Sequence, residues 1–397
     1  MPSLENTSAR VILKPGRDKS LKNRHPWVFS GGIAAIEGEF APGDILPVFA
    51  AKGNLLGKGF VNPASQIRVR MLTIGGETVD TGLLDLRLSQ AQALREQFLP
   101  PDTDAYRLVH GEADLLPGLI IDRYGDNWVV QFHALGMARL KPQIVDILKK
   151  RFQPNAILDR CETKALTEEG LTPTREVLHG KLPEKVRFRE NNLQFYADLL
   201  EGQKTGFFLD QRDNRALIGK VASGKRLLNC FSYTGGFSIY AAVNGASTTS
   251  LDISEPAIAL AQENFALNGL DAQTHRFITA NVFDFLRQPD QEYDVIVLDP
   301  PAFVKSKKHI DKGARGYKDI NRLAIKQVAD GGLVLTCSCS PFVDWHLFQQ
   351  IVFSAAQEAG RQVQILARPG QPADHPVSIF HPEGEYLKTL LLRVVEA

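Results

Sequence analysis

The stretch "RLLNCFSYTGGFS", residues 226–238, decides the fold of the C-terminal half of this 397-residue chain. Its first six residues are typical of a buried strand, and Gly235-Gly236 are small enough to let a ligand approach the backbone where a helix begins. An ordinary strand-to-helix turn would explain the same residues, so the stretch alone leaves both interpretations open. The spacing is not GxGxxG, which disfavours a dinucleotide with a pyrophosphate and therefore a nicotinamide oxidoreductase.

Apolar strands alternate with helical segments from about residue 204 to the C-terminus. Strands are predicted at 226–231, 248–253, 275–281, 293–301, 331–338, 362–368 and 385–395, and helices at 236–245, 254–269 and 318–330. Continuous apolar strands separated by helices indicate a parallel sheet that is covered on both faces. We therefore expect an α/β, doubly wound domain with seven strands over residues 201–397, in which the last strands form an antiparallel hairpin.

The N-terminal half has a different pattern. Residues 1–72 contain short β segments broken at short intervals by Gly and Pro, which predicts a small β-barrel. Residues 73–200 combine a helix that ends at Pro100-Pro101, several strands, and a hairpin whose turn is Glu190-Asn191-Asn192. We expect a central α+β domain there, so the chain is predicted to have three domains.

Composition excludes several classes of protein. An apolar content of 44% with 23% charged residues is typical of a soluble globular chain, and no apolar run approaches the length of a membrane-spanning helix. The polar N-terminus carries no secretory signal. Four cysteines do not make a disulfide framework, so a reducing, cytoplasmic setting is expected.

Polar residues follow the predicted strands of the α/β domain, at the sheet edge where such folds bind ligands. Asn229 ends the first strand, and Asp252 follows the second, where a carboxylate can accept both hydroxyls of a ribose. Asp252 would equally cap the helix that starts near Ser254. Asp284, after the third strand, can accept a proton from an adenine amino group. Together these positions indicate an adenosine pocket without a phosphate cradle.

The fourth strand ends in Asp299-Pro300-Pro301. The two prolines fix a rigid turn, because each locks its own φ and restricts the residue before it. This turn leaves the Asp299 carboxylate and backbone carbonyls facing the pocket, where they suit hydrogen bonding to the edge of a planar amine or amide.

The motifs "NCFSYTGGFS", "LDIS", "DPPAF" and "TCSCS", preceded by "GQKTGFFLDQR" (202–212), resemble those of class I S-adenosylmethionine-dependent methyltransferases. More narrowly, they are similar to the ribosomal RNA large-subunit cytosine-5 methyltransferase family that carries an N-terminal PUA domain. Residues 16–33 resemble the start of that PUA domain, and residues 110–126 resemble the family's central domain. The likeness spans most of the chain in the same order, and the 202–212 motif with "FSYTGGFS" is its most specific part.

The resemblance implies S-adenosylmethionine as the cofactor and assigns residues to it. The 202–212 segment would close over the methionine end of the donor. Asp210 and Arg212 are candidates for contacts with the donor there, and a structural salt bridge between the two is the alternative. The predicted donor-binding residues are Lys204, Thr205, Phe207, Asn229, Phe231, Tyr233, Gly235, Asp252, Asp284 and Asp299.

Two cysteines, Cys337 and Cys339, stand at the end of the fifth strand. A metal site is disfavoured, because the other two cysteines are isolated and no histidine has finger spacing, and a disulfide across one residue of a strand is sterically poor. In the family pattern the second cysteine is the nucleophile that adds to carbon 6 of cytosine, which maps to Cys339. Asp299 would hold the amino edge of the base and assist protonation of ring nitrogen 3. Cys337 is expected to be a packing residue. The alternative is that it replaces the extra cysteine that other RNA cytosine-5 methyltransferases carry after the fourth-strand proline, where this chain has Ala302-Phe303.

RNA is the expected partner, although the net charge is only +1. Residues 1–70 have an excess of five positive charges, and a second basic cluster follows the Asp-Pro-Pro turn. A solvated surface would explain both clusters, and we favour RNA. The predicted RNA-binding residues are Lys14, Arg17, Lys19, Lys22, Arg24, Lys305, Lys307 and Lys308, and a homodimer is kept among the expected assemblies.

Two other functions stay open. The Asp-Pro-Pro turn also suits transfer of a methyl group to a nitrogen of an RNA base, in which case both cysteines would be structural. A chain that binds RNA and assists ribosome assembly without catalysis is the second alternative, and the complete set of donor-pocket positions argues against it.

Overall fold

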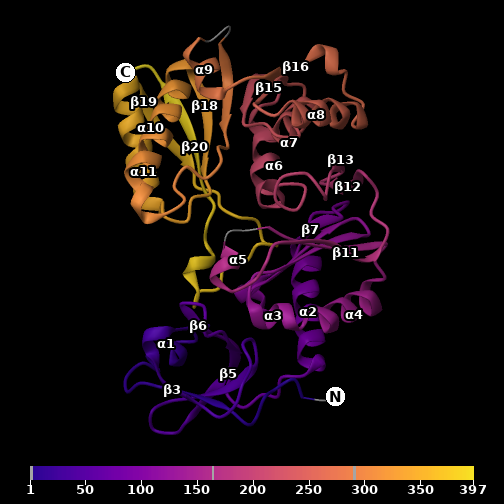
Figure 1. Cartoon of the computed structure of the whole chain (residues 1–397). Coiled ribbons are helices and arrows are strands. Elements are labelled where there is room, and N and C mark those ends of the chain that lie inside the picture. The colour runs from indigo at the N-terminus through magenta and orange to yellow at the C-terminus, as the bar shows by residue number, and fades with distance from the viewer. Residues whose placement is uncertain (1–2, 163–164, 289–291) are drawn as a thin grey trace. The chain divides into compact units, whose positions relative to one another are not determined.

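The computed structural model describes residues 3–162, 165–288 and 292–397. The chain divides into two compact units, which Figure 1 shows in a single colour ramp along the sequence. The first unit consists of residues 1–188, 197–209 and 373–384, and the second of residues 189–196, 210–372 and 385–397. Each unit is described separately below.

The N-terminal part of the first unit is a six-stranded sheet with the order β2-β6-β5-β4-β1-β3. Apolar side chains from alternating positions, such as Val11, Val48 and Val69, fill its core. The PUA-like β domain predicted from the sequence is confirmed. Its elements are β1 (Arg10–Leu13), α1 (Lys19–Lys22), β2 (Trp27–Phe29), β3 (Ile33–Glu37), β4 (Ile45–Phe49), β5 (Leu55–Val61) and β6 (Ile67–Ile74).

A five-stranded sheet with the order β11-β10-β9-β8-β7 forms the rest of the first unit, and its core includes Leu88, Trp128 and Ile144 from helices and strands together. This is the expected central α+β region. Its elements are α2 (Thr81–Phe98), β7 (Ala105–His110), β8 (Leu119–Tyr124), β9 (Asn127–Phe132), α3 (Leu135–Arg139), α4 (Lys141–Phe152), β10 (Ala156–Cys161), α5 (Ala165–Glu168) and β11 (Thr174–Gly180).

A two-stranded sheet follows, made of β12 (Val186–Glu190) and β13 (Leu193–Ala197). Asn191 and Asn192 join the strands and both have a positive φ, at 52° and 67°. Asparagine tolerates this backbone conformation better than most residues, which is why the predicted hairpin turn forms there.

The second unit is built on a seven-stranded sheet with the order β16-β15-β14-β17-β18-β20-β19. Strands β14 to β18 run parallel, and β20 is antiparallel to both of its neighbours. The chain reverses its direction of sheet growth between β14 and β17, which marks the edge where ligands bind in such folds. The strands are β14 (Arg226–Cys230), β15 (Ser247–Asp252), β16 (Arg276–Thr279), β17 (Tyr293–Leu298), β18 (Val328–Ser338), β19 (Gln362–Ala367) and β20 (Lys388–Val395).

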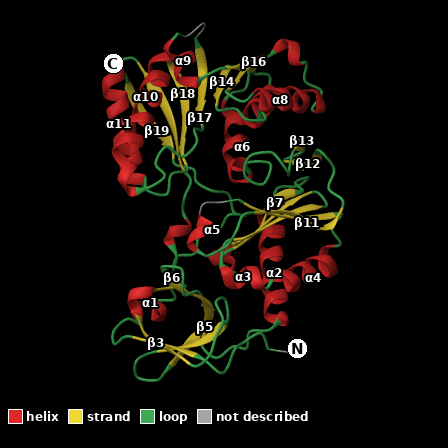
Figure 2. Cartoon of the chain, in the orientation of Figure 1, coloured by secondary structure: helices red, strands yellow, loops and turns green. Residues whose placement is uncertain are grey.

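Helices cover both faces of this sheet (Figure 2). Leu228 packs in the core with residues of α9, α10 and α11, whereas its neighbour Leu227 packs in the core with α6 and α7, because successive residues of a strand face opposite sides. The predicted doubly wound α/β fold is therefore confirmed. The helices are α6 (Arg212–Val221), α7 (Gly236–Ala242), α8 (Glu255–Leu267), α9 (Val282–Arg287), α10 (Ile310–Gln327) and α11 (Trp345–Ala359).

Two features differ from the sequence expectations. The helix predicted at 318–330 begins at Ile310. Gly313 and Gly316 weaken the helical pattern of its first half, and both glycines pack closely against Phe303. Residues 373–384, between β19 and β20, pack with the first unit rather than with the sheet that they interrupt. The division into domains at 1–72, 73–200 and 201–397 stays a prediction.

Candidate functional site

The loop after β14 has an unusual backbone. Phe231, Tyr233 and Gly235 all have a positive φ, at 59°, 47° and 82°. A Cβ on Gly235 would lie 3.0 Å from the Cβ of Ala261 in α8, so a larger residue would be both strained and crowded. Such strain in non-glycine residues persists where the surroundings enforce it, and it concentrates at functional sites. The loop keeps backbone, rather than side chains, at the opening of α7.

Asp252 connects this loop to β15. Its Oδ2 accepts a hydrogen bond from the backbone N–H of Tyr233 at 2.8 Å, and its Oδ1 accepts one from Ser254 N–H at 2.9 Å. Ser254, not Asp252, is the N-cap of α8, because its hydroxyl accepts from Ala257 N–H. A carboxylate has about four acceptor positions. Asp252 therefore retains acceptor capacity for the two hydroxyls of a ribose.

Asn229 is buried below this loop. Its Nδ2 donates to the hydroxyl of Ser238 at 3.0 Å, and Ser250 donates to the same hydroxyl at 2.7 Å. These bonds tie β14, α7 and β15 together. A direct contact of Asn229 with the donor stays a prediction.

Asp284 lies in the first turn of α9, and its side chain is 77% exposed. It pairs with Arg287 at 3.3 Å, so its predicted contact with adenine stays a prediction. Two further residues at this edge of the sheet were not predicted from the sequence. Ile253, directly after Asp252, leaves 72% of its apolar surface exposed, and Asn281 is the N-cap that follows β16. An apolar residue directly after Asp252, the acid predicted to bind a ribose, was the available sequence signal for Ile253.

Asp299 follows the last residue of β17. Leu298 pairs with Cys230 of β14 on one side and with Thr336 of β18 on the other. Asp299 therefore stands at the carboxyl edge of the sheet, between the strained loop and the end of β18, and its side chain is half-buried. The sheet register thus brings the edge positions of Phe231, Asp252 and Asp299 to neighbouring strands.

The two adjacent cysteines have different surroundings. Cys337 belongs to β18, is fully buried, and packs in the core with Leu335 and Leu391. Thr389 donates to its sulfur at 3.5 Å, and burial raises the pKa of the Cys337 thiol well above its ordinary value. Cys339 lies beyond the end of the strand and is half-buried. Because the strand ends at Ser338, alternation along a strand does not give the two thiols a common side.

Lys388 is a residue of this site that sequence reasoning missed. It is the first residue of β20, pairs with Ser338 of β18, and is 3% exposed. Its Nζ donates to the carbonyls of Ser340 at 2.8 Å and Tyr386 at 2.7 Å. Burial lowers the pKa of Lys388 to about 8, although the neighbouring acidic groups Cys339, Glu385 and Asp344 act to raise it. A lysine inside the apolar run "YLKTLLLRVV" was the available signal.

Ser340 holds the backbone that carries Cys339. Its hydroxyl contacts the Tyr317 hydroxyl at 2.9 Å and accepts from Val304 N–H at 3.2 Å. With the bond from Lys388, three elements converge on the residue next to Cys339. The segment 339–340 is therefore held rigidly although it is outside regular structure.

The predicted donor-binding residues Lys204, Thr205 and Phe207 belong to the first unit. Thr205 donates to Asp122 at 2.7 Å and contacts the Tyr124 hydroxyl at 2.9 Å, and Phe207 is buried. The Lys204 ammonium lies 4.5 Å from the ring centre of Phe208, and its backbone has a positive φ of 52°. The roles of these three residues in donor binding stay predictions.

Asp210 belongs to the second unit, where its Oδ2 accepts from the Tyr386 hydroxyl at 2.7 Å. Arg212 begins α6 and lies 3.4 Å from Asp213. Whether Asp210 and Arg212 contact the donor stays a prediction.

The predicted RNA-binding residues are exposed cations. Lys14 donates to the carbonyl of Gly31, and Lys22 pairs with Asp18 at 2.6 Å. Lys305, Lys307 and Lys308 precede α10 and are also exposed.

In the three described stretches of the chain, no cluster of His, Cys, Asp and Glu could hold a metal ion. The same stretches contain no helix long and apolar enough to cross a membrane.

Comparison with known proteins agrees with this geometry. Residues 11–74 match the family model of the PUA-like domain, and residues 172–393 match that of an S-adenosylmethionine-dependent methyltransferase. The chain is 43% identical over 395 residues to "Ribosomal RNA large subunit methyltransferase I" of Alteromonas mediterranea, covering 98% of this chain and 100% of that protein. It is 44% identical to the protein of the same name from Shewanella denitrificans, covering 97% of this chain and 99% of that protein.

Solved structures share the fold. A SAM-dependent methyltransferase from Streptococcus mutans aligns with a TM-score of 0.82 at 23% identity, covering 97% of this chain and 99% of that one. A methyltransferase structure in complex with SAH aligns with a TM-score of 0.83 at 23% identity and the same coverage.

Proposed function

Because the chain belongs to the family of S-adenosylmethionine-dependent methyltransferases with an N-terminal PUA-like domain, we propose that it forms 5-methylcytosine in large-subunit ribosomal RNA. Its cofactor is S-adenosylmethionine. The names of the relatives, which specify methylation of large-subunit ribosomal RNA, support the substrate class. The position on the base is argued from the chain's own residues.

The single observation that supports carbon 5 is the contrast between the two cysteines. Cys339 is half-buried at the carboxyl edge of the sheet, beside the buried cation of Lys388, whereas Cys337 is packed in the core. Carbon 5 of cytosine is a poor nucleophile, and a thiolate that adds to carbon 6 makes it reactive. Only the thiolate form attacks, and a neighbouring cation favours that form.

The proposed reaction proceeds through a covalent adduct. The Cys339 thiolate forms a bond to carbon 6, and the electron pair of the ring double bond moves toward ring nitrogen 3, which Asp299 protonates. The donor supplies an electrophilic methyl group bound to a sulfonium. Carbon 5 would take that methyl group and leave the donor as a neutral thioether. Ring nitrogen 3 returns its proton to Asp299, a base removes the proton of carbon 5, and the bond between carbon 6 and the Cys339 sulfur breaks to return the thiolate. The cytosine must be unpaired or flipped out to reach these residues.

The donor site of the second unit fits S-adenosylmethionine. Asp252 retains acceptor positions for the ribose, Ile253 offers an exposed apolar surface to the adenine, and Gly235 keeps the loop free of a Cβ beside α8. We add Ile253 and Asn281 to the proposed donor contacts. The other proposed contacts are those predicted from the sequence, namely Lys204, Thr205, Phe207, Asn229, Phe231, Tyr233, Asp284 and Asp299.

The cations predicted from the sequence are proposed to contact RNA phosphates, namely Lys14, Arg17, Lys19, Lys22 and Arg24 in the PUA-like domain and Lys305, Lys307 and Lys308 before α10. A cytoplasmic setting and a homodimer remain part of the proposal, as does the three-domain division. Weakening of RNA affinity with added salt is the expected sign of the phosphate contacts.

The test uses ribosomal RNA from a strain that lacks this chain. Mass spectrometry of that RNA should show the loss of one 5-methylcytosine, which the purified protein and S-adenosylmethionine restore. RNA that contains 5-fluorocytosine should form a covalent complex, because fluorine cannot leave as the proton does, and Cys339→Ala should abolish this complex. Full activity of Cys339→Ala would instead support methylation of a nitrogen. If the purified protein binds S-adenosylmethionine but does not restore the 5-methylcytosine, the result would favour a non-catalytic assembly protein.

A further inference from the structure

The segment 373–384, here called the arm, is anchored firmly in the first unit. The Asp374 carboxylate accepts from the backbone N–H of Arg107 at 3.0 Å, and the Asp374 carbonyl accepts from Arg95 at 2.9 Å. His375 is buried with its ring 5.3 Å from that of His110. One end of the arm is therefore fixed to the central sheet.

The other end of the arm is fixed to the PUA-like domain. The ring of His381 lies 4.4 Å from that of Trp27, and His25 Nε2 lies 3.4 Å from Glu383. The indole N–H of Trp27 donates to Glu112 at 2.8 Å. Trp27 therefore connects the arm to the PUA-like domain through contacts on its ring and on its indole N–H.

Between these anchors, Ile379 and Phe380 are held at the surface. Ile379 is 88% exposed and Phe380 is 43% exposed. Burying apolar side chains is the main favourable term in folding, so two fixed neighbours left in water indicate a surface that binds something.

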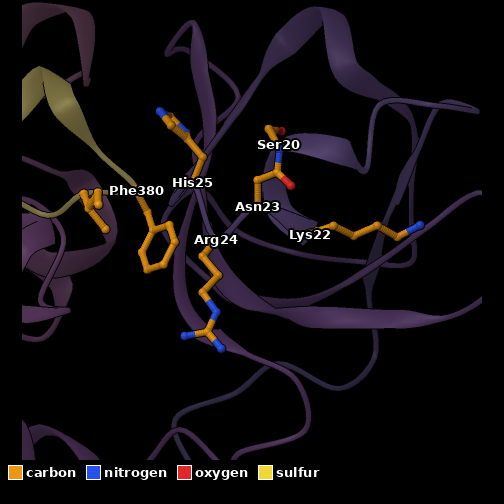
Figure 3. Close-up of a pocket in the computed structure, with 7 residues that line it drawn as sticks. Ser20, Lys22, Asn23, Arg24, His25 and Phe380 are labelled. Atoms are coloured by element: carbon orange, nitrogen blue, oxygen red, sulfur yellow. The ribbon is translucent and has the colours of Figure 1, made fainter.

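A pocket of about 680 Å³ opens where the arm meets α1 and the loop after it. Figure 3 shows Phe380 beside Arg24, whose guanidinium carbon lies 5.5 Å from the ring centre, while Lys22 extends away from the ring. Arg24 also has a positive φ of 62°, a backbone conformation that is uncommon for residues other than glycine. The lining residues are Ser20, Lys22, Asn23, Arg24, His25, Ile379 and Phe380.

We propose that this pocket binds one unpaired nucleotide of the RNA substrate, with the base on Phe380 and Ile379 and the adjoining phosphates at Arg24 and Lys22. Its seven lining residues include cations, hydrogen-bonding side chains and no carboxylate. Two acids lie next to lining residues: Asp18 pairs with Lys22, and Glu383 lies 3.4 Å from His25. An aromatic face beside cations is how proteins hold single-stranded nucleic acid.

This inference rests on the proposed function, from which it takes RNA as the ligand. It adds a binding site that two separate parts of the chain form together. A segment between the last two strands of the catalytic sheet completes an RNA pocket on the PUA-like domain. Neither part supplies both the cations and the aromatic ring.

The test measures the affinity of the full chain for a fluorescently labelled single-stranded RNA. Phe380→Ala should weaken binding by roughly 5- to 100-fold, the range for losing one stacked base. Phe380→Tyr should retain affinity, whereas Phe380→Leu should lose it. Phe353→Ala, which removes another exposed phenylalanine on α11, is the matched control and should bind as the wild type does. Unchanged affinity of Phe380→Ala would overturn the proposal.

Arg24→Asn tests the phosphate contact, because asparagine tolerates the left-handed backbone without the charge. The slope of log affinity against log salt should become shallower by about 0.7, the value for one phosphate of a single strand. Arg10→Ala, an exposed arginine of β1, is the control. An unchanged slope, or equal affinity of Phe380→Leu and Phe380→Tyr, would indicate an apolar protein partner and overturn the nucleotide site.

Turnover separates this inference from the proposed function. At saturating RNA, Phe380→Ala should methylate at the wild-type rate while its KM for RNA rises. A wild-type product other than 5-methylcytosine would overturn the proposed chemistry and leave the pocket intact. Normal 5-methylcytosine with no change of KM would overturn only the pocket.

Discussion

Lys388 donates a hydrogen bond from its buried ammonium to the backbone carbonyl of Ser340 at 2.8 Å, directly beside the residue proposed as the nucleophile. The bond places a positive charge against the segment that carries Cys339. An opposite charge nearby favours ionisation of a thiol. We therefore propose that Lys388 activates Cys339, which would make a histidine unnecessary for that step.

Lys388→Met should make Cys339 less reactive at neutral pH. We expect the midpoint of its alkylation by iodoacetamide to move up by about one pH unit, because the thiolate loses its neighbouring cation. Mass spectrometry of the labelled peptide reports on Cys339 alone, since the other three cysteines are buried. Lys220→Met, an exposed lysine of α6, should leave the midpoint unchanged. An unmoved midpoint in Lys388→Met would remove Lys388 from the mechanism.

The same lysine should make stability depend on pH. Its pKa is about 8 in the folded chain and 10.5 ordinarily, so the unfolded state binds more protons between these values. The free energy of unfolding contributed by Lys388 should therefore rise as pH increases from about 8 to 10.5, with a ceiling of about 3 kcal/mol.

Denaturant titrations across that pH range would measure this contribution as the free energy of unfolding of the wild type minus that of Lys388→Met. The subtraction removes the tyrosines and the three buried cysteines, whose titration is the same in both proteins. A difference that stays flat, or falls with pH, would show that Lys388 is not destabilised by burial.

Cys337→Ala should lower the free energy of unfolding by about 1–2 kcal/mol, because it removes a sulfur from a packed core, and should leave methylation intact. Cys339→Ala should do the reverse, with turnover lost and stability near that of the wild type. Chemical denaturation and a methylation assay on both variants make the comparison. A Cys337→Ser variant that accumulates a covalent RNA adduct would assign Cys337 a role in product release.

The sequence predicted the sheet well, because its determinants are local. Each buried strand is an apolar run with a turn at its end, and Asp252 and Asp299 could be placed at the carboxyl edge from that alternation alone. The exposure of Asp284 was harder to predict from the sequence. The direction of a side chain in a short helix depends on which residue begins that helix.

Long-range pairing explains what was missed. Lys388 joins the site only through the antiparallel register of β18 and β20, which links residues far apart in sequence. The arm contains no strong helix or strand pattern, and its importance arises from contacts with Trp27 and Arg107 in the other half of the chain.

Asp252→Asn should weaken the binding of S-adenosylmethionine by about 10- to 100-fold. The amide loses the charge, and its NH₂ group cannot accept from a ribose hydroxyl or from Tyr233 N–H. Calorimetry with the donor measures the change, and Asp271→Asn, an exposed cap of a short helical turn, is the control. Equal affinities for the two variants would mean that the ribose binds elsewhere.

Gly235→Ala should damage the donor site through crowding as well as backbone strain. The new Cβ would lie 3.0 Å from that of Ala261, and φ is 82°. Gly269→Ala is a matched control, since Gly269 has a φ of 70° with nothing within 4 Å of its Cβ position. Both variants should lose about 1–2 kcal/mol of stability from the left-handed backbone.

Only Gly235→Ala should also lose affinity for S-adenosylmethionine, because relief of its clash must displace the loop that binds Asp252. The double variant Gly235→Ala with Ala261→Gly removes the crowding atom and should recover much of that affinity, while the backbone cost remains. Calorimetry and thermal unfolding on the four proteins separate the two effects. If Gly269→Ala and Gly235→Ala bind the donor equally well, the close approach of α8 to this loop has no part in shaping the site.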